Sequence, residues 1–254
     1  MKRRSIGRTL WIPSPDPDEE SRDAVRRTPV IRRLGRAFLA VLVAVPALTV
    51  ALVLPWRWIP PPITAFILRE RLVSDEPVYY DWVPYEEISG NLGIAVVAAE
   101  DQKFPIHHGF DWESIQDALQ DAQNGQDLRG ASTISQQVAK NLYLTPGQNW
   151  IRKGTEAYLT AWIELLWPKR RILEVYMNVA EFGPGVFGVG AAAARLIEKA
   201  PSELSGYDAS VLAAVLPSPK RMLVAQPSSY VRTRAGQIRT SVRQLGGSGH
   251  LAGL

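Results

Sequence analysis

The sequence contains no cysteine and only three histidines among its 254 residues. The lack of cysteine excludes disulfides, thiolate metal sites and cysteine nucleophiles. Two of the histidines, His107 and His108, are adjacent, so their side chains point in different directions on most backbones. We therefore expect neither redox chemistry on sulfur nor a histidine-based metal centre.

Most of the chain also lacks an excess of positive charge. The net charge of +4 comes from residues 1–36, which hold ten basic and five acidic side chains. Residues 37–254 hold 19 basic and 20 acidic side chains, so they do not carry the basic footprint of a nucleic-acid-binding protein. Nucleic acid is therefore not an expected partner.

Charged residues are absent from Ala37 to Leu54, and Trp56 and Trp58 follow this apolar run. A helix of this length measures about 27 Å, close to the hydrocarbon thickness of a bilayer, and tryptophan is typical of the membrane interface. The sequence predicts one transmembrane helix over residues 37–56. A cleaved signal peptide is disfavoured because residues 1–36 are too long for its basic region. A buried core helix is the other alternative.

The charges that flank this run predict its orientation. Ten basic residues precede it, and only Arg57 follows it closely. By the positive-inside rule, residues 1–36 form a cytoplasmic basic tail and residues 57–254 form one domain outside the cytoplasm.

Residues 57–254 show the apolar spacing of helices, with breaks at glycine and proline and no run of alternating strands. Residues 75–84 are expected to form an irregular connector. A glycine-rich stretch, EFGPGVFGVGAAAA, lacks the ending of a phosphate-binding loop and predicts a tight turn into a helix. The fold class is mainly α, with helices expected over residues 91–100, 112–123, 132–143, 151–167, 169–178, 188–199, 207–216 and 230–244.

Glu100 is the first candidate for chemistry, because it ends a strongly apolar helix. Burial of a carboxylate raises its pKa, which suits a general base or acid near neutral pH. The alternative is that Glu100 or Asp101 only caps a helix or pairs with a surface cation.

Two further stretches offer polar and cationic groups. If Ser132 or Thr133 caps a helix, then Thr133, Gln136, Gln137 and Lys140 share one face, and such a stripe suits sugar hydroxyls and a phosphate. Arg152 and Lys153 precede Glu156 by about one turn, so they can clamp a charged leaving group. A solvated helix face and a surface ion pair are the respective alternatives.

In combination these residues resemble a known family. The stretches AVVAAEDQKFPIHHGFD, GASTISQQVAKNL, RKGTE and KRRILEVYMNVAEFGPGVFGV are similar, in this order, to four motifs of the family 51 glycosyltransferases, the peptidoglycan polymerases. The final stretch, SYVRTRAGQIRTSVRQLGG, is similar to the tail of the monofunctional biosynthetic peptidoglycan transglycosylases of Gram-negative bacteria. The chain lacks a Ser-x-x-Lys motif, so cross-linking by a transpeptidase is not expected.

The resemblance implies a lysozyme-like, two-lobed helical domain that binds lipid II and the nascent glycan strand at the inner membrane. Glu100 would be the general base, and Lys140, Arg152 and Lys153 would stabilise the pyrophosphate, with Glu156 orienting them or a divalent ion. No cofactor is required, although the pyrophosphate leaves room for a divalent cation. The remaining expected substrate-binding or supporting residues are Asp101, Phe104, His107, Ser132, Thr133, Gln136 and Gln137.

One residue departs from the family pattern. Gln148 stands where relatives often have arginine, so one phosphate-site cation is missing from the sequence. Two other functions remain as alternatives: a lytic wall-cleaving enzyme of the same architecture, and a catalytically silent membrane scaffold of a wall-synthesis complex. Wall-synthesis or division proteins are further expected partners, which the sequence does not identify.

Overall fold

The computed structural model describes residues 17–124, 132–147 and 149–254. The chain divides into two compact units, one that ends at Leu48 and one that spans Thr49–Leu254. The first unit consists, in its described part, of most of helix α1 (Pro17–Val53). Helical residues Arg32–Arg57 are long and apolar enough to cross a membrane, and an 18-residue window within them has a mean hydropathy of 2.8. This stretch includes the predicted transmembrane helix.

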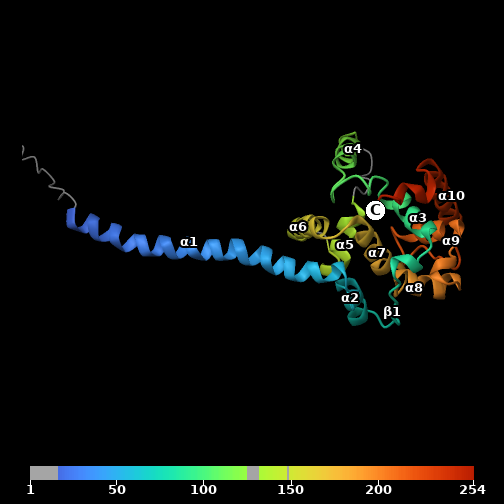
Figure 1. Ribbon diagram of the computed structural model, residues 1–254, viewed down its shortest axis with the longest axis horizontal. Helices are drawn as coiled ribbons and strands as arrows, with labels where there is room; N and C mark the ends of the chain where they lie inside the picture. Colours follow the sequence, from blue (N-terminus) through green and yellow to red (C-terminus); the bar gives the residue numbers. More distant parts are fainter. Residues whose placement is uncertain (1–16, 125–131, 148) are drawn as a thin grey trace, which may run out of the picture. The chain divides into compact units, whose positions relative to one another are not determined.

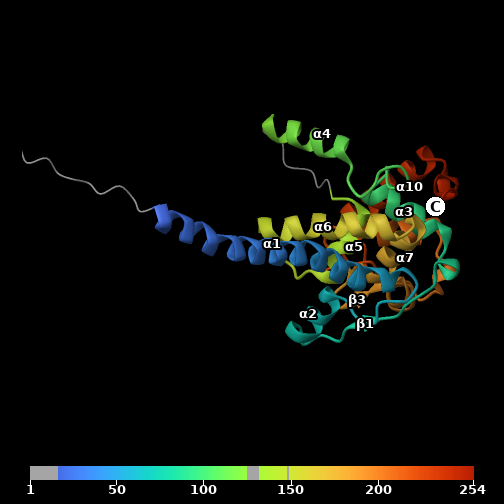
Figure 2. The same ribbon diagram turned by 60° about the vertical axis from the view of Figure 1, so that its left-hand side comes forward.

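The second unit consists of helices and one small sheet (Figures 1 and 2). A turn of π-helix, η3 (Ala193–Ile197), directly follows α8. The other short helices are η1 (Leu54–Arg57), η2 (Tyr85–Glu87), η4 (Pro201–Glu203) and η5 (Gly247–Leu251). The α-helices are α2 (Ala65–Val73), α3 (Gly90–Glu100), α4 (Trp112–Gln123), α5 (Ile134–Tyr143), α6 (Trp150–Leu166), α7 (Lys169–Val179), α8 (Gly188–Ala192), α9 (Gly206–Val215) and α10 (Ser229–Gln244).

Every segment predicted to be helical contains a helix, but two predictions need correction. The expected helix over residues 188–199 is α8 followed by the π turn, and it ends at Glu198, which has a left-handed φ of 60°. Helix α2 is not among the predicted elements. Its residues mix charged and apolar side chains without a clear stripe, so their spacing gives no helical signal.

Helices α3 and α9 form the centre of the core. Both are apolar on all sides, which is typical of a helix surrounded by other elements. Val96 and Val97 of α3 and Leu212 of α9 are completely buried. Helices α9 and α10 pack beside α3, whereas α4 projects from the rest of the unit in both views. The end of α3 is therefore fixed by the packed core, and this is where Glu100 lies.

A three-stranded sheet lies in segments expected to be irregular. Strands β1 (Tyr79–Tyr80), β2 (Glu181–Gly183) and β3 (Val186–Phe187) have the order β1-β3-β2. Strand β1 runs parallel to β3, and β2 runs antiparallel to it. Strands of two or three residues are too short to show the alternation that predicts a strand.

Asn178, at the end of α7, contacts two other backbone segments: the one at Val83 and the turn after β3. Asn178 at the end of α7 is fully buried, and its amide bonds the backbone N–H and C=O of Val83 at 2.8 and 2.9 Å. Gly188 has a φ of +78°, and a Cβ there would overlap the carbonyl group of Asn178. Only glycine fits this position without strain.

We expect Gly188→Ala to lower the free energy of unfolding by about 2 kcal/mol or more, because it combines a left-handed φ with a backbone overlap. Urea unfolding of the detergent-solubilised chain measures this change. The matched control is Gly236→Ala in α10, where a Cβ meets nothing within 4 Å, and a gain of about 0.5–1 kcal/mol is expected. Equal stability of the two variants would contradict the close approach at Gly188.

Candidate active site

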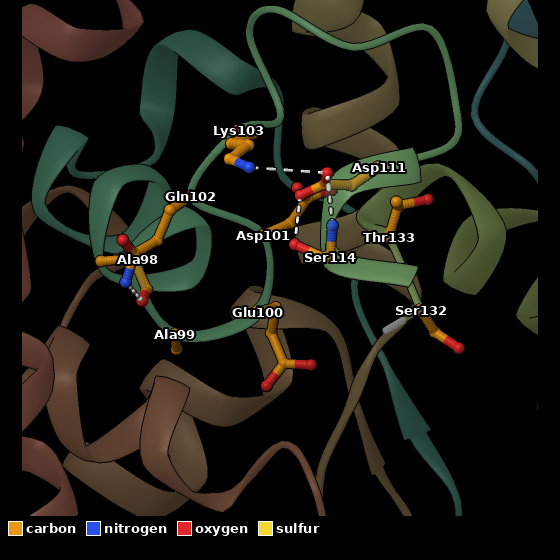
Figure 3. A pocket seen from close by; sticks show the side chains of 10 residues that line it. All are labelled: Ala98, Ala99, Glu100, Asp101, Gln102, Lys103, Asp111, Ser114, Ser132 and Thr133. Carbon is orange, nitrogen blue, oxygen red and sulfur yellow. Dashed lines mark hydrogen bonds and ion pairs between the residues drawn. The ribbon is translucent and has the colours of Figure 1, made fainter. Parts of the chain in front are cut away.

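Glu100 is the last residue of α3, and its side chain lines a pocket of about 260 Å³. In Figure 3 the Glu100 carboxylate points away from Asp101, Lys103, Asp111 and Ser114, which gather on another side of the pocket. The complete lining is Ala98, Ala99, Glu100, Asp101, Gln102, Lys103, Asp111, Ser114, Ser132 and Thr133.

The Glu100 carboxylate is held by a chain of hydrogen bonds. Gln137 Nε2 of α5 donates to Glu100 Oε2 at 2.9 Å, and Tyr176 Oη of α7 donates to Gln137 Oε1 at 3.2 Å. Because Tyr176 bonds the amide oxygen, the amide nitrogen of Gln137 faces Glu100. Burial raises the pKa of Glu100, and Gln137, Arg234 and Lys140 lower it in part. A carboxyl group with a raised pKa can accept and release protons near neutral pH.

Asp101 links the end of α3 to the beginning of α5. It is buried, and its carboxylate accepts hydrogen bonds from His107 Nε2 and from the backbone N–H of Ile134, the first residue of α5, all at 2.9 Å. The Gly109 N–H donates to His107 Nδ1, which places the proton of a neutral ring on Nε2. Asp101 and His107 therefore hold the turn after Glu100 rather than facing the pocket as free groups.

Phe104 fills the core beneath the same turn. Its side chain is completely buried, and its ring contacts that of His107 edge to face at 6.2 Å. Lys169 of α7 lies over the Phe104 ring at 4.4 Å and pairs with Glu164 of α6. Phe104 thus anchors the turn to two further helices.

Helix α5 begins with reciprocal capping, which changes the predicted polar stripe. Thr133 Oγ1 accepts from the Gln136 N–H at 3.2 Å, and Gln136 Oε1 accepts from the Thr133 N–H at 3.0 Å. These two buried side chains are occupied by the cap, so of the four residues expected on one face, Gln137 and Lys140 are the two that line a pocket without taking part in the cap. Ser132 precedes the cap and is exposed at the pocket.

Lys140 lines a second pocket of about 200 Å³, together with Phe66, Gln137, Asn141 and Tyr176. The hydrogen bond between Glu100 and Gln137 links a lining residue of the first pocket to one of the second. Burial lowers the pKa of Lys140, and the nearby carboxylates of Glu156 and Glu100 oppose this effect. Within the described part of the chain, the Lys140 ammonium forms no ion pair within 4.0 Å.

Arg152, Lys153 and Glu156 form an ionic cluster on the first turns of α6. Glu156 is buried; its Oε2 accepts from Arg152 Nη1 at 3.2 Å, and its Oε1 accepts from Lys153 Nζ. Together with Lys140, the cluster contains three cations and one carboxylate. Its excess positive charge is available to a dianionic or polyanionic group.

Comparison with known proteins identifies the family. The model of the family described as transglycosylase matches residues 69–243. The chain belongs to the transglycosylase family. It is 48% identical over 235 residues to a biosynthetic peptidoglycan transglycosylase of Xylella fastidiosa, covering 90% of this chain and 95% of that protein. It is 51% identical over 227 residues to one of Pseudomonas putida, covering 87% and 94%.

A third relative, of Stutzerimonas stutzeri, carries the same name and is 50% identical over 210 residues, which are 81% of this chain and 87% of the relative. The prediction of a mainly helical, lysozyme-like transglycosylase domain preceded by one apolar helix is confirmed. As the resemblance implied, the chain is an enzyme, a peptidoglycan glycosyltransferase.

Several residues of this transglycosylase reach the site without having been predicted as site residues. Tyr176, which orients Gln137, stands in the fourth matching stretch, where a closer reading could have found it. Arg234 of α10 lies 3.9 Å from Glu100, but nothing in its local sequence signals that contact. Gln148, the departure from the family pattern, lies outside the described residues.

The described residues do not suit a divalent cation at Glu156. Both carboxylate oxygens already accept from cationic side chains. Residues 17–124, 132–147 and 149–254 contain no group of three or more histidine, aspartate or glutamate side chains arranged to hold a metal ion. We therefore derive no step through a metal.

We expect Asp101→Asn to lower the free energy of unfolding by about 1–3 kcal/mol. The amide keeps one acceptor oxygen, but its NH2 group replaces the second oxygen, so that either His107 Nε2–H or the Ile134 N–H faces a donor or a weaker acceptor in a buried site. Urea unfolding measures the loss, with the exposed Asp117→Asn in α4 as the control. If both variants unfold at the wild-type urea concentration, Asp101 does not hold the turn.

Proposed function

We propose that this transglycosylase polymerises peptidoglycan glycan strands by transferring the growing lipid-linked strand onto lipid II. The observation that carries the proposal is the pairing of two pockets. One contains a partly buried carboxylate with a raised pKa, Glu100, and the other contains Lys140, a cation without an ion pair among the described residues. Glycosyl transfer from a pyrophosphate needs both a proton acceptor and a stabiliser of the leaving group.

In the proposed reaction Glu100 accepts the proton of the 4-hydroxyl of lipid II. That oxygen attacks the anomeric carbon of the growing strand and forms the new glycosidic bond. The bond between the anomeric carbon and the pyrophosphate oxygen breaks, and undecaprenyl pyrophosphate leaves with the electron pair. Direct displacement inverts the α-linked donor to a β-1,4 product.

Lys140, Arg152 and Lys153 would stabilise the negative charge that develops on the pyrophosphate. Lys140 supplies a partly buried charge that has no ion pair in the described parts of the chain, and burial strengthens its interaction with an anion. Arg152 and Lys153 already pair with Glu156, which holds them in fixed positions at little cost when the substrate binds. Glu156 therefore acts in this proposal as an orienting residue for the two cations.

The other candidate residues divide into two groups. Ser132 and Gln137 have polar atoms at the pockets and would contact the sugars or the pyrophosphate. Thr133 and Gln136 hold the start of α5, and Asp101, Phe104 and His107 hold the turn after Glu100. Their role in the reaction would be to keep Glu100 and Gln137 at hydrogen-bonding distance.

We further propose that residues 37–56, which include the apolar part of α1, span the inner membrane, with residues 1–36 in the cytoplasm and the enzymatic domain, residues 57–254, in the periplasm. The charge asymmetry around the apolar run supports this orientation. Trp150 and Ile151 at the start of α6 are 92% and 85% exposed, which suits contact with membrane lipid close to the lipid-linked substrates. A tether would raise the effective concentration of the domain at the leaflet that holds lipid II.

A lytic enzyme is the second candidate, because a buried glutamate also serves as a general acid. The excess of cations near Lys140 favours polymerisation, since hydrolysis of a glycan has no pyrophosphate leaving group. A silent scaffold would have no need for a carboxylate with a raised pKa in a pocket.

Glu100→Gln should reduce polymerisation of labelled lipid II by about 10²–10⁴-fold, the usual contribution of a general base. The amide keeps the shape of the side chain but accepts no proton. The assay uses the full chain in detergent, with the exposed Glu76→Gln as control. If Glu100→Gln makes nearly as much polymer as the wild type, another residue is the general base.

The pH dependence of wild-type activity provides a second test of the role of Glu100. Burial raises the pKa of Glu100, and the base works only when ionised. Activity should therefore be full above this raised pKa and fall as the pH drops through it, at a higher pH than for an exposed glutamate.

Lys140→Met should reduce the rate of polymerisation by about 10²–10³-fold, because it removes a cation that acts on developing charge and retains the apolar stem. Turnover at saturating lipid II measures this effect. The control is Lys199→Met, whose lysine lies outside both pockets and pairs with Asp208. Unchanged turnover in Lys140→Met would show that Lys140 belongs to an ordinary helix surface and does not stabilise the leaving group.

A further inference from the structure

Arg234 faces the oxygen of Glu100 that Gln137 does not bind. Its Nη2 lies 3.9 Å from Glu100 Oε1, and its side chain is 27% exposed. Arg234 Nε is buried and has no hydrogen-bond partner among the described residues. A buried donor without a partner is costly, so its retention beside the partly buried Glu100 carboxylate calls for a functional explanation.

We infer that Arg234 is a positioning residue for Glu100, which keeps the base carboxylate ionised and turned towards the acceptor hydroxyl. The inference rests on the proposed role of Glu100 as the general base. Arginine suits this task because it stays charged at every pH at which the enzyme works.

The groups around Glu100 show why a dedicated cation is needed. Asp101 from α3 adds a like charge, and the buried Tyr176 from α7 acts through Gln137. On the pocket wall, Lys103 pairs with Glu113 and with Asp111. Lys140 from α5 and Arg234 from α10 are the cations that lower the pKa of Glu100.

Lys140 and Arg234 would have different tasks during turnover. Lys140 lines the second pocket and lies near the Arg152, Lys153 and Glu156 cluster. When a pyrophosphate is bound there, its negative charge offsets the positive charge of Lys140, which then stabilises the Glu100 carboxylate less. Arg234 is an unshared counter-charge for Glu100, since no other carboxylate lies within 4.0 Å of it among the described residues. Its charge remains with the base when the leaving group is bound.

The separation of 3.9 Å also suits a working base. A charge-assisted hydrogen bond measures about 2.7–2.9 Å and would occupy a lone pair of Oε1. At 3.9 Å the guanidinium stabilises the ionised form through space but does not bond the oxygen. Oε1 can therefore still accept the proton from the acceptor hydroxyl.

Packing of α10 places Arg234. Val231, Ala235 and Ile238 of this helix are buried, and α10 packs against both α9 and α3. Because α3 ends at Glu100, the two charged groups lie on adjoining elements of the same core. Arg234 is thus held by the rigid part of the domain.

The test compares pH profiles of kcat/KM for lipid II polymerisation by the full chain in detergent. The acid limb is the fall of kcat/KM at low pH. Arg234→Gln should move this limb to higher pH by about 0.5–1 pH unit, a modest effect because the arginine is partly exposed. Arg234→Lys should restore the wild-type limb, since it restores the charge. The exposed Arg239→Gln on the same helix is the control and should leave the limb in place.

An acid limb that is unmoved in folded Arg234→Gln overturns the inference. If Arg234→Gln does not fold, Arg234→Lys decides, because a limb displaced from that of the wild type despite the retained charge also overturns the inference. Glu100→Gln separates the two levels of the account. If Glu100→Gln is inactive and the limb is unmoved in Arg234→Gln, only the role of Arg234 is wrong. If Glu100→Gln is active, Glu100 is not the general base.

Discussion

The buried carboxylate of Asp101 fixes the geometry on which the rest of the site depends. It joins the turn after α3 to the first N–H of α5, so the last residue of one helix and the second turn of the other lie side by side. Glu100 and Gln137 meet because of this junction.

Glu100 and Glu156 are both shielded from water, but different groups surround them. Glu100 is partly removed from water, which raises its pKa, and three groups from two helices limit that rise. Glu156 is buried as well, but two cations one turn away compensate its charge. Two glutamates of one chain therefore differ in behaviour because of their neighbours: one is suited to accept a proton, and the other to hold cations.

The sequence predicts the helices well where apolar spacing is strong, as in α3 and α9, and fails at α2 and the short strands, which give little periodic signal. Glu100 at the end of an apolar helix and the cluster at Glu156 could be proposed from local sequence, and their roles in the reaction stay predictions. Thr133 and Gln136 share a stripe in the sequence but are used for capping, a choice set by the local backbone. Arg234 is beyond prediction from spacing, since tertiary packing of α10 alone brings it to Glu100.

The central claim is that the two pockets join glycosyl units with release of a pyrophosphate, and product analysis tests it most directly. The full chain is incubated in detergent with lipid II labelled in its sugars and, separately, with purified cell-wall glycan. The account predicts a β-1,4 polymer from lipid II, with one undecaprenyl pyrophosphate released for each disaccharide added, and no fragments from the wall glycan. Release of soluble fragments from the wall glycan, without polymer from lipid II, would contradict it.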